Sequence, residues 1–128
     1  MPYEISWLVD KRVIYTRMYG YVTGEDLRNN NADMQAFVQD SELLLHTITD
    51  ATETTGTDMG LRDLQNTQFT SVENLGWGIY ISPSKMNRFF AGIITQLNKK
   101  RGRQFETLDE ALKFLNEMDN TLPPLSKP

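Results

Sequence analysis

Hydroxyl and carboxylate side chains that could take part in chemistry are concentrated in residues 50–58, which read Asp-Ala-Thr-Glu-Thr-Thr-Gly-Thr-Asp. This stretch follows an apolar, β-rich run at residues 43–49, and Leu61 and Leu64 then recur at helical spacing. The pattern predicts a strand, a turn and the start of a helix. Open α/β sheets place their sites outside the carboxyl ends of such strands. The candidate residues of this threonine loop are Asp50, Thr52, Thr54, Thr55, Thr57 and Asp58.

Two interpretations of the threonine loop remain open. Threonine and aspartate side chains hold turns and cap helices, and this structural role alone accounts for their presence. In the other interpretation a hydroxyl is phosphorylated, which adds a charge of about −1.5 to −2 beside Glu53 and Asp58 and alters any docking surface. The lysine and glycine spacing of a P-loop is missing, so a nucleotide-phosphate site is not expected there.

Acid–base and metal chemistry have little support in the sequence. His46 is the only histidine, and in the predicted strand it shares a face with Leu44 and Ile48, so we expect it to be packed and hydrogen-bonded. There is no cysteine, and one histidine with scattered acids makes no metal site. We therefore expect no cofactor, no metal and no enzyme activity. An enzyme that uses Asp50 or a threonine hydroxyl is the remaining alternative.

Length and composition restrict the class of protein. The 128 residues suffice for one domain, and the formal net charge of −4 argues against a nucleic-acid partner. The absence of cysteine excludes disulfides and suits a reducing compartment. No export signal is visible at the N-terminus, and no apolar run reaches the roughly 18 residues of a membrane span. The expected location is the cytoplasm, without stable membrane insertion.

The order of predicted elements indicates an α/β fold. Alternating runs at residues 3–9 and 13–22 flank a polar turn and predict an antiparallel hairpin in which Gly20 marks a bulge. Helices and strands then alternate, which predicts a mostly parallel mixed sheet of four or five strands with helices packed on it. Residues 1–119 form this single domain, and residues 120–128, which include three prolines, are expected to be a flexible tail.

The predicted third helix, which begins after Ser82-Pro83-Ser84, has the clearest helical periodicity. Its apolar positions are Met86, Phe89, Phe90, Ile93, Ile94 and Leu97. Such a face is typical of core packing against the sheet. The alternative is an exposed apolar strip that forms an interface or a ligand site. The candidate residues for that apolar surface are Trp77, Phe89, Phe90 and Ile93.

Three sequence stretches, together with the order of elements, carry a resemblance to a known family. They are ITDATETTGTDMGL at the centre, WGIYIS before the third helix, and GRQFETLDEALKFL, where a capping box opens the last helix. Residues 3–118 or so resemble the STAS family, and more closely its SpoIIAA-like group, which has the fold of the bacterial anti-sigma-factor antagonists.

The resemblance implies a function as well as a STAS-like fold. Antagonists of this family carry a phosphorylatable serine or threonine in the central loop and bind a kinase partner there. By position, Asp50 resembles the aspartate that closes the central strand, and Thr55 or Thr57 lies where the modified hydroxyl is found. We therefore expect a non-catalytic cytoplasmic regulatory or protein-interaction module with a protein partner, phosphoregulated through the threonine loop. The alternative is a binder of a small apolar or lipid-like ligand between the sheet and the third helix, and a homodimer stays open.

Overall fold

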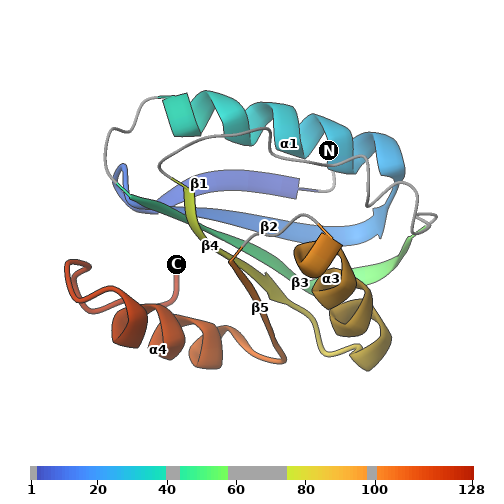
Figure 1. Cartoon of the computed structure of the whole chain (residues 1–128). Coiled ribbons are helices and arrows are strands. Elements are labelled where there is room, and N and C mark those ends of the chain that lie inside the picture. The colour runs from blue at the N-terminus through green and yellow to red at the C-terminus, as the bar shows by residue number, and fades with distance from the viewer. Residues whose placement is uncertain (1–2, 40–43, 58–74, 98–100) are drawn as a thin grey trace.

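A mixed sheet of five strands forms the centre of the computed structural model, which describes residues 3–39, 44–57, 75–97 and 101–128 (Figure 1). β1 and β2 are antiparallel, whereas every later strand is parallel to its neighbour. The strands lie side by side in sequence order: β1 (Tyr3–Val9), β2 (Val13–Val22), β3 (Leu45–Thr57), β4 (Leu75–Ile81) and β5 (Gly102–Phe105). The predicted mixed sheet with an N-terminal antiparallel hairpin is confirmed.

The hairpin and its irregularities follow from local sequence. The turn between β1 and β2 closes with a hydrogen bond of 3.0 Å from the Arg12 amide to the Val9 carbonyl. Further along β2, Gly20 has a φ of +68°, and the pairing with β3 shifts between Gly20 and Tyr21. This left-handed backbone favours glycine. A bulge is therefore present at the position predicted, but its extra residue belongs to β3, opposite Gly20.

The described helices cover both faces of the sheet: α1 (Gly24–Gln39), α3 (Lys85–Leu97) and α4 (Leu108–Met118). Met34 of α1 packs on Ile14 and Leu45, whose side chains face one side of the sheet. Gln104, which is on that same face, lies close to α3, because a Cβ atom built on Gly92 would be 3.3 Å from its Oε1. α1 and α3 therefore share a face, and α4 covers the opposite one (Figure 1).

The face under α4 holds the largest apolar cluster. α4 begins with the predicted capping box, in which the Thr107 hydroxyl accepts a hydrogen bond from the Glu110 amide. The helix places Phe114 against Trp77, with ring centroids 4.9 Å apart. The buried members of this α4 cluster are Val13, Tyr15, Ile48, Ile79, Ile81, Ala111, Leu112, Phe114, Leu115 and Leu122.

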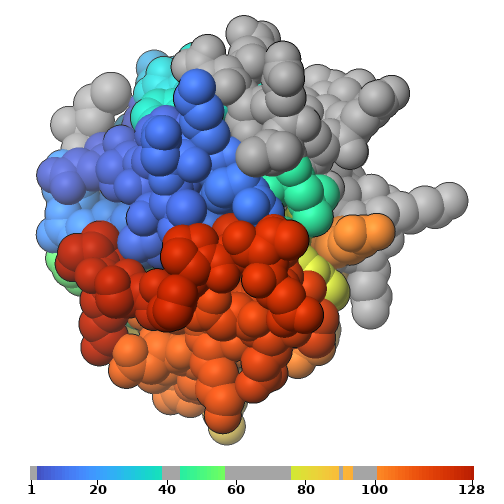
Figure 2. Space-filling view, turned by 90° about the vertical axis from the view of Figure 1, so that its left-hand side faces the viewer, coloured from blue at the N-terminus to red at the C-terminus, as the bar shows by residue number. Residues whose placement is uncertain are grey.

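The C-terminal segment is part of the packed domain, so the prediction of a flexible tail at residues 120–128 is wrong. Leu122 is buried in the α4 cluster, and Leu125 packs against its rim. The Asn116 side chain fixes the segment, because it donates to the Pro123 carbonyl and accepts from the Leu125 amide, both at 2.9 Å. Figure 2 shows the segment, in red, lying against the blue N-terminal strands. Two leucines are enough to hold the segment in place, because the strands and α4 form the apolar cluster on which they pack.

The face under α1 has two smaller apolar clusters. One combines Ile14, Leu45, Met34 and Val38, and the other combines Tyr3, Met18 and Val22. α1 begins with a reciprocal capping motif: Asp26 accepts from the Thr23 amide, and the Asp26 amide donates to the Thr23 hydroxyl. The short helix expected near residues 60–67 lies outside the described residues.

Candidate functional site

The threonine stretch is a strand in the structure, not the predicted loop. β3 continues to Thr57, and its far half pairs with the end of β2, from Tyr19 opposite Glu53 to Val22 opposite Thr57. β4 stops opposite Asp50. Residues 51–57, which we call the β3 extension, therefore pair with β2 alone among the described residues. The turn prediction failed because threonine suits strands as well as turns when a neighbouring strand is long enough. Asp58 lies outside the described residues.

Asp50 is buried at the point where the β3 extension begins. One of its carboxylate oxygens accepts a 2.5 Å hydrogen bond from the Tyr15 hydroxyl. The other accepts from the amide and the hydroxyl of Thr52, at 3.1 and 2.7 Å. Burial, and then the hydrogen bond to Asp50, raise the pKa of Tyr15 well above its ordinary value. Both carboxylate oxygens are thus hydrogen-bonded, and the carboxylate stabilises the irregular start of the extension.

The threonines of the extension differ in whether their hydroxyls already form hydrogen bonds. The Thr52 hydroxyl is bonded to Asp50, and the Thr54 hydroxyl donates to the Ala51 carbonyl at 2.8 Å. Thr55 is exposed, and its hydroxyl has no partner in the described part of the chain. It is also the extra residue of the bulge, since Gly20 pairs with Thr54 and Tyr21 with Gly56. The Thr57 side chain lies outside the described residues.

Charge on the extension is locally balanced. Glu53 accepts two hydrogen bonds from the Arg17 guanidinium, at 3.2 and 2.5 Å. The guanidinium also lies over the Tyr19 ring, 4.6 Å from its centroid. This cluster faces solvent, so it contributes little to stability. It does fix the position of the Glu53 carboxylate, next to Thr52 and Thr54 in the strand.

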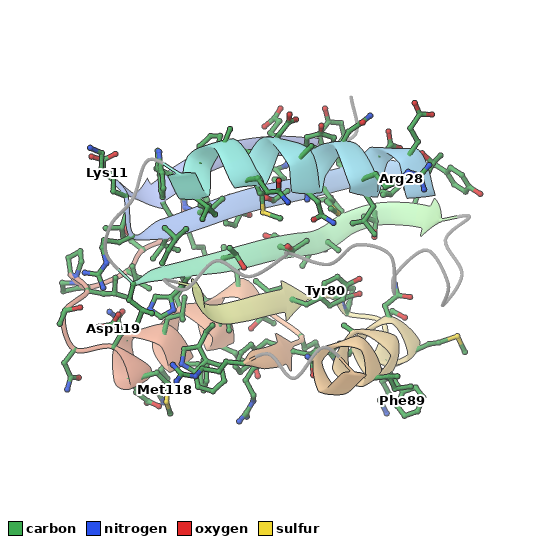
Figure 3. The ribbon with its side chains drawn as sticks, turned by 45° about the horizontal axis from the view of Figure 1, so that its top comes forward. Lys11, Arg28, Tyr80, Phe89, Met118 and Asp119 are labelled. Carbon is green, nitrogen blue, oxygen red and sulfur yellow. The ribbon has the colours of Figure 1, made fainter. Side chains whose placement is uncertain are left out.

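The residues predicted to form one apolar surface are not together in the structure. Trp77 lies on the α4 face, against Phe114. Phe89 is on α3, on the other face, and is 66 % exposed, pointing away from the sheet in Figure 3. Ile93 is half-buried on the same helix, and the Phe90 side chain lies outside the described residues. Strand alternation sends Trp77 to the face opposite α3, which the helical pattern alone did not reveal.

His46 is a packed, hydrogen-bonded histidine, as predicted, with 1 % of its surface exposed. Its Nδ1 accepts from the Trp77 amide at 2.9 Å, and its Nε2 lies 2.9 Å from an Asp119 carboxylate oxygen. Because Nδ1 accepts a backbone N–H, the ring proton is on Nε2 and is donated to Asp119. Both nitrogens are therefore engaged within the fold.

Asp119 is the centre of a polar cluster that sequence reasoning missed (Figure 3). Its carboxylate also accepts from the Arg12 guanidinium at 2.9 Å and from the amide and hydroxyl of Thr121. Burial by itself raises the pKa of Asp119, but the bonds from Thr121 and His46 and the nearby Arg12 outweigh it and lower the pKa to about 2. No sequence signal could find this cluster, because His46 and Arg12 are 73 and 107 residues from Asp119.

The described ranges contain neither a cluster of metal ligands nor a membrane-spanning helix. Within them, no three side chains of His, Asp or Glu come together as metal ligands. No helix in those ranges is long and apolar enough to cross a membrane.

Comparisons with known proteins identify the fold. No family model matches the chain, and no curated protein matches it. A solved structure from Shewanella loihica PV-4, of an uncharacterized DUF3478-family protein with a SpoIIAA-like fold, is 15 % identical with a TM-score of 0.63, and the match covers 88 % of this chain and 91 % of that one.

A second solved structure gives the same result. The anti-sigma factor antagonist SpoIIAA in its unphosphorylated form is 13 % identical with a TM-score of 0.59, and the match covers 94 % of this chain and 99 % of that one. Both matches extend over nearly the whole length of each chain. The chain therefore has the STAS-like fold of the SpoIIAA-like proteins.

Proposed function

We propose that this chain is a non-catalytic regulatory module that binds a protein partner through the β3 extension. The observation that supports the proposal best is Thr55, an exposed hydroxyl on the extra residue of a bulge at the end of the central strand. Bulges aim side chains away from regular pairing and are frequent at functional sites. The similar SpoIIAA structure is described as an anti-sigma factor antagonist, whose activity is a contact with another protein.

A non-catalytic role accords with the state of the acid–base groups. His46 uses both ring nitrogens, and Asp50 uses both carboxylate oxygens, in bonds within the fold. A general base must reach a substrate proton with a free lone pair. His46 offers none without breaking a buried bond, and Asp50 is only 6 % exposed to any substrate. Contact rather than catalysis is therefore the function that the geometry supports.

Phosphorylation of Thr55 is the regulatory part of the proposal. Thr52 and Thr54 would have to give up hydrogen bonds to be modified, whereas Thr55 would not. A phosphate there adds about −1.5 to −2 charge to a surface where Arg17 already pairs with Glu53 and lies 3.6 Å from Glu4. The modified extension becomes strongly negative, and a partner that docks on the unmodified surface should be released.

Site-specific photocrosslinking tests the partner surface. A photoreactive residue at position 55 should give a discrete adduct in the native cells, whereas one at the exposed Lys113 on α4 should not. An adduct of twice the chain's mass would identify a second copy as the partner. Equal adducts at both positions, or none at position 55, would contradict the proposal.

Intact-mass analysis tests the phosphorylation. A phosphorylated form recovered from the native cells should disappear in Thr55→Val and persist in Thr52→Val. A phosphate that maps to another residue would remove the regulatory part while leaving the partner surface intact. The apolar-ligand alternative receives no support from Trp77 and Phe89, which are on opposite faces.

A further inference from the structure

Among the described residues, two side chains under α1 are buried without hydrogen-bond partners. Asn30 is 1 % exposed and Thr16 is 0 % exposed. Neither the amide oxygen and nitrogen of Asn30 nor the hydroxyl of Thr16 has a partner in the described part of the chain. Buried polar groups are nearly always bonded in folded proteins, because an unmade bond lowers stability. These two residues therefore call for an explanation other than packing.

Their positions show that they belong together. Asn30 lies one helical turn from Leu27 and one from Met34, which pack into the two separate clusters under α1. Thr16 lies between Ile14 and Met18, which belong to the same two clusters. The amide and the hydroxyl thus occupy the gap between two apolar clusters, on facing sides of the helix–sheet interface.

Thr16 is also the first member of a polar row across the sheet. It pairs with Thr49 on β3, Thr49 pairs with Tyr80 on β4, and Tyr80 pairs with Gln104 on β5. Paired residues of neighbouring strands point to the same face, so the row runs from beneath α1 to α3, and Figure 3 shows Tyr80 between those helices. Beside the row, Gly78 is exposed and carries no side chain.

The row contains hydroxyl and amide groups and no charge. Burial raises the pKa of Tyr80, although the hydrogen bond between its side chain and Ser82 acts in the opposite direction. A row without cations offers little to an anion, and a row without carboxylates offers little to a cation. An apolar ligand would leave Asn30 and Thr16 unpaired, as they already are. The chemistry that satisfies them is a neutral group with a hydrogen-bond donor and acceptor side by side.

We propose that the polar row Thr16–Thr49–Tyr80–Gln104, together with Asn30, binds a small uncharged molecule that presents adjacent hydrogen-bond donors and acceptors, such as a cyclic amide or a vicinal diol. This site is separate from the β3 extension and goes beyond the proposed partner binding. Asn30 and Thr16 are sealed in the free protein, so the ligand enters as α1 shifts from the sheet. The two small clusters that hold α1 make that shift easier than a movement of α4.

Thermal melts of the free chain provide the first test. A ligand site keeps its polar groups unpaired at the expense of stability. Asn30→Leu and Thr16→Val should therefore each raise the melting temperature. Asn116→Leu is the matched control: its amide is bonded at both ends, so that variant should melt lower than wild type. A fall in melting temperature for Asn30→Leu would show that the pair holds an internal water as part of the fold, and would overturn the proposal.

The second test uses two defined probes, uracil as the cyclic amide and ribose as the vicinal diol. In NMR titrations of the isotope-labelled full chain, one of them should shift the Asn30 side-chain resonance and the amides of Thr16, Thr49 and Tyr80 in a saturable manner. The shifts should be lost in Asn30→Leu and kept in Thr55→Val. If both probes leave the Asn30 resonance unmoved, the assigned ligand class is wrong. The probe that binds identifies which of the two chemistries the row accepts.

Discussion

The two faces of the sheet differ in how continuously apolar side chains fill them. Under α4, side chains from β2, β3, β4 and α4 form one continuous apolar cluster, closed at its edge by Leu122. Under α1, the apolar contacts of the described residues divide into two groups, and Thr16 and Asn30 lie between them without hydrogen-bond partners in that part of the chain. The comparison indicates that most of the stability comes from the α4 face. The α1 face retains polar groups that a purely structural interface would replace.

Truncation of core side chains should show the largest difference between the faces. Leu115→Ala, at a fully buried position on α4, should lower the free energy of unfolding by about 4 kcal/mol. Met34→Ala should cost only about 2 kcal/mol, because the smaller cluster under α1 can relax around the gap. Urea denaturation of both variants measures the difference. Equal losses would mean that the two faces contribute alike.

Glycine substitutions in β4 should also separate the faces. A Cβ atom on Gly76 would lie 2.5 Å from Nδ1 of His46, whereas one on Gly78 would have contacts of 3.7 Å. Gly76→Ala should therefore displace the imidazole, break its bonds to Trp77 and Asp119, and cost about 3 kcal/mol. Gly78→Ala should cost less than about 1 kcal/mol. Similar melting temperatures for the two variants would show that the His46 contacts contribute little.

The cluster around Asp119 should make the stability of the fold decrease in acid. The pKa of this carboxyl is about 2 in the folded state, below the ordinary value of 3.8. A lowered pKa stabilises the fold above the unfolded value, and the stabilisation is lost as the pH falls toward 2. Wild type should therefore lose about 2 kcal/mol between about pH 5 and pH 2 that Asp119→Asn does not lose. Parallel pH profiles for both proteins would contradict this account.

Two tyrosine–aspartate bonds give the finest comparison. Tyr15 donates to Asp50, which is buried, and Tyr3 donates to Asp33 at 2.6 Å, where the carboxylate is exposed. Tyr15→Phe removes the hydrogen bond to one oxygen of a buried carboxylate, which keeps only its bonds from Thr52, whereas water replaces the hydroxyl in Tyr3→Phe. The expected losses are about 2 and about 1 kcal/mol, measured by urea denaturation. A larger loss of stability for Tyr3→Phe would show that the bond to the exposed Asp33 contributes more than the bond to the buried Asp50.

Local signals in the sequence were sufficient to predict most of the fold. Alternation in residues 3–9 and 13–22 predicted the hairpin, and the Thr107 capping box predicted the start of α4. In each case the interactions that form the element lie within a few residues of one another. Those patterns also carried the resemblance to the STAS family, which the two solved structures confirm for the fold.

The features that sequence reasoning missed depend on distant contacts. The strand at residues 51–57 exists because β2 extends to Val22 beside it, and a composition of threonines is equally typical of a turn. Leu122 and Leu125 pack because α4 and β2 prepare an apolar surface for them. The partner of His46 is 73 residues away. The candidate residues Asp50 and Thr55 were found, but their different roles required the pairing register of the sheet.

The link between Arg12 and Asp119 has a consequence for the kinetics of folding. It joins residues 107 positions apart, so forming it closes nearly the whole chain into a loop. Loop closure of that length is entropically unfavourable until the strands between have assembled, and we expect the contact to form after the transition state. Contacts that form late leave the folding rate unchanged and slow unfolding. The bond from the β1–β2 turn to the C-terminal segment should therefore lengthen the lifetime of the native state.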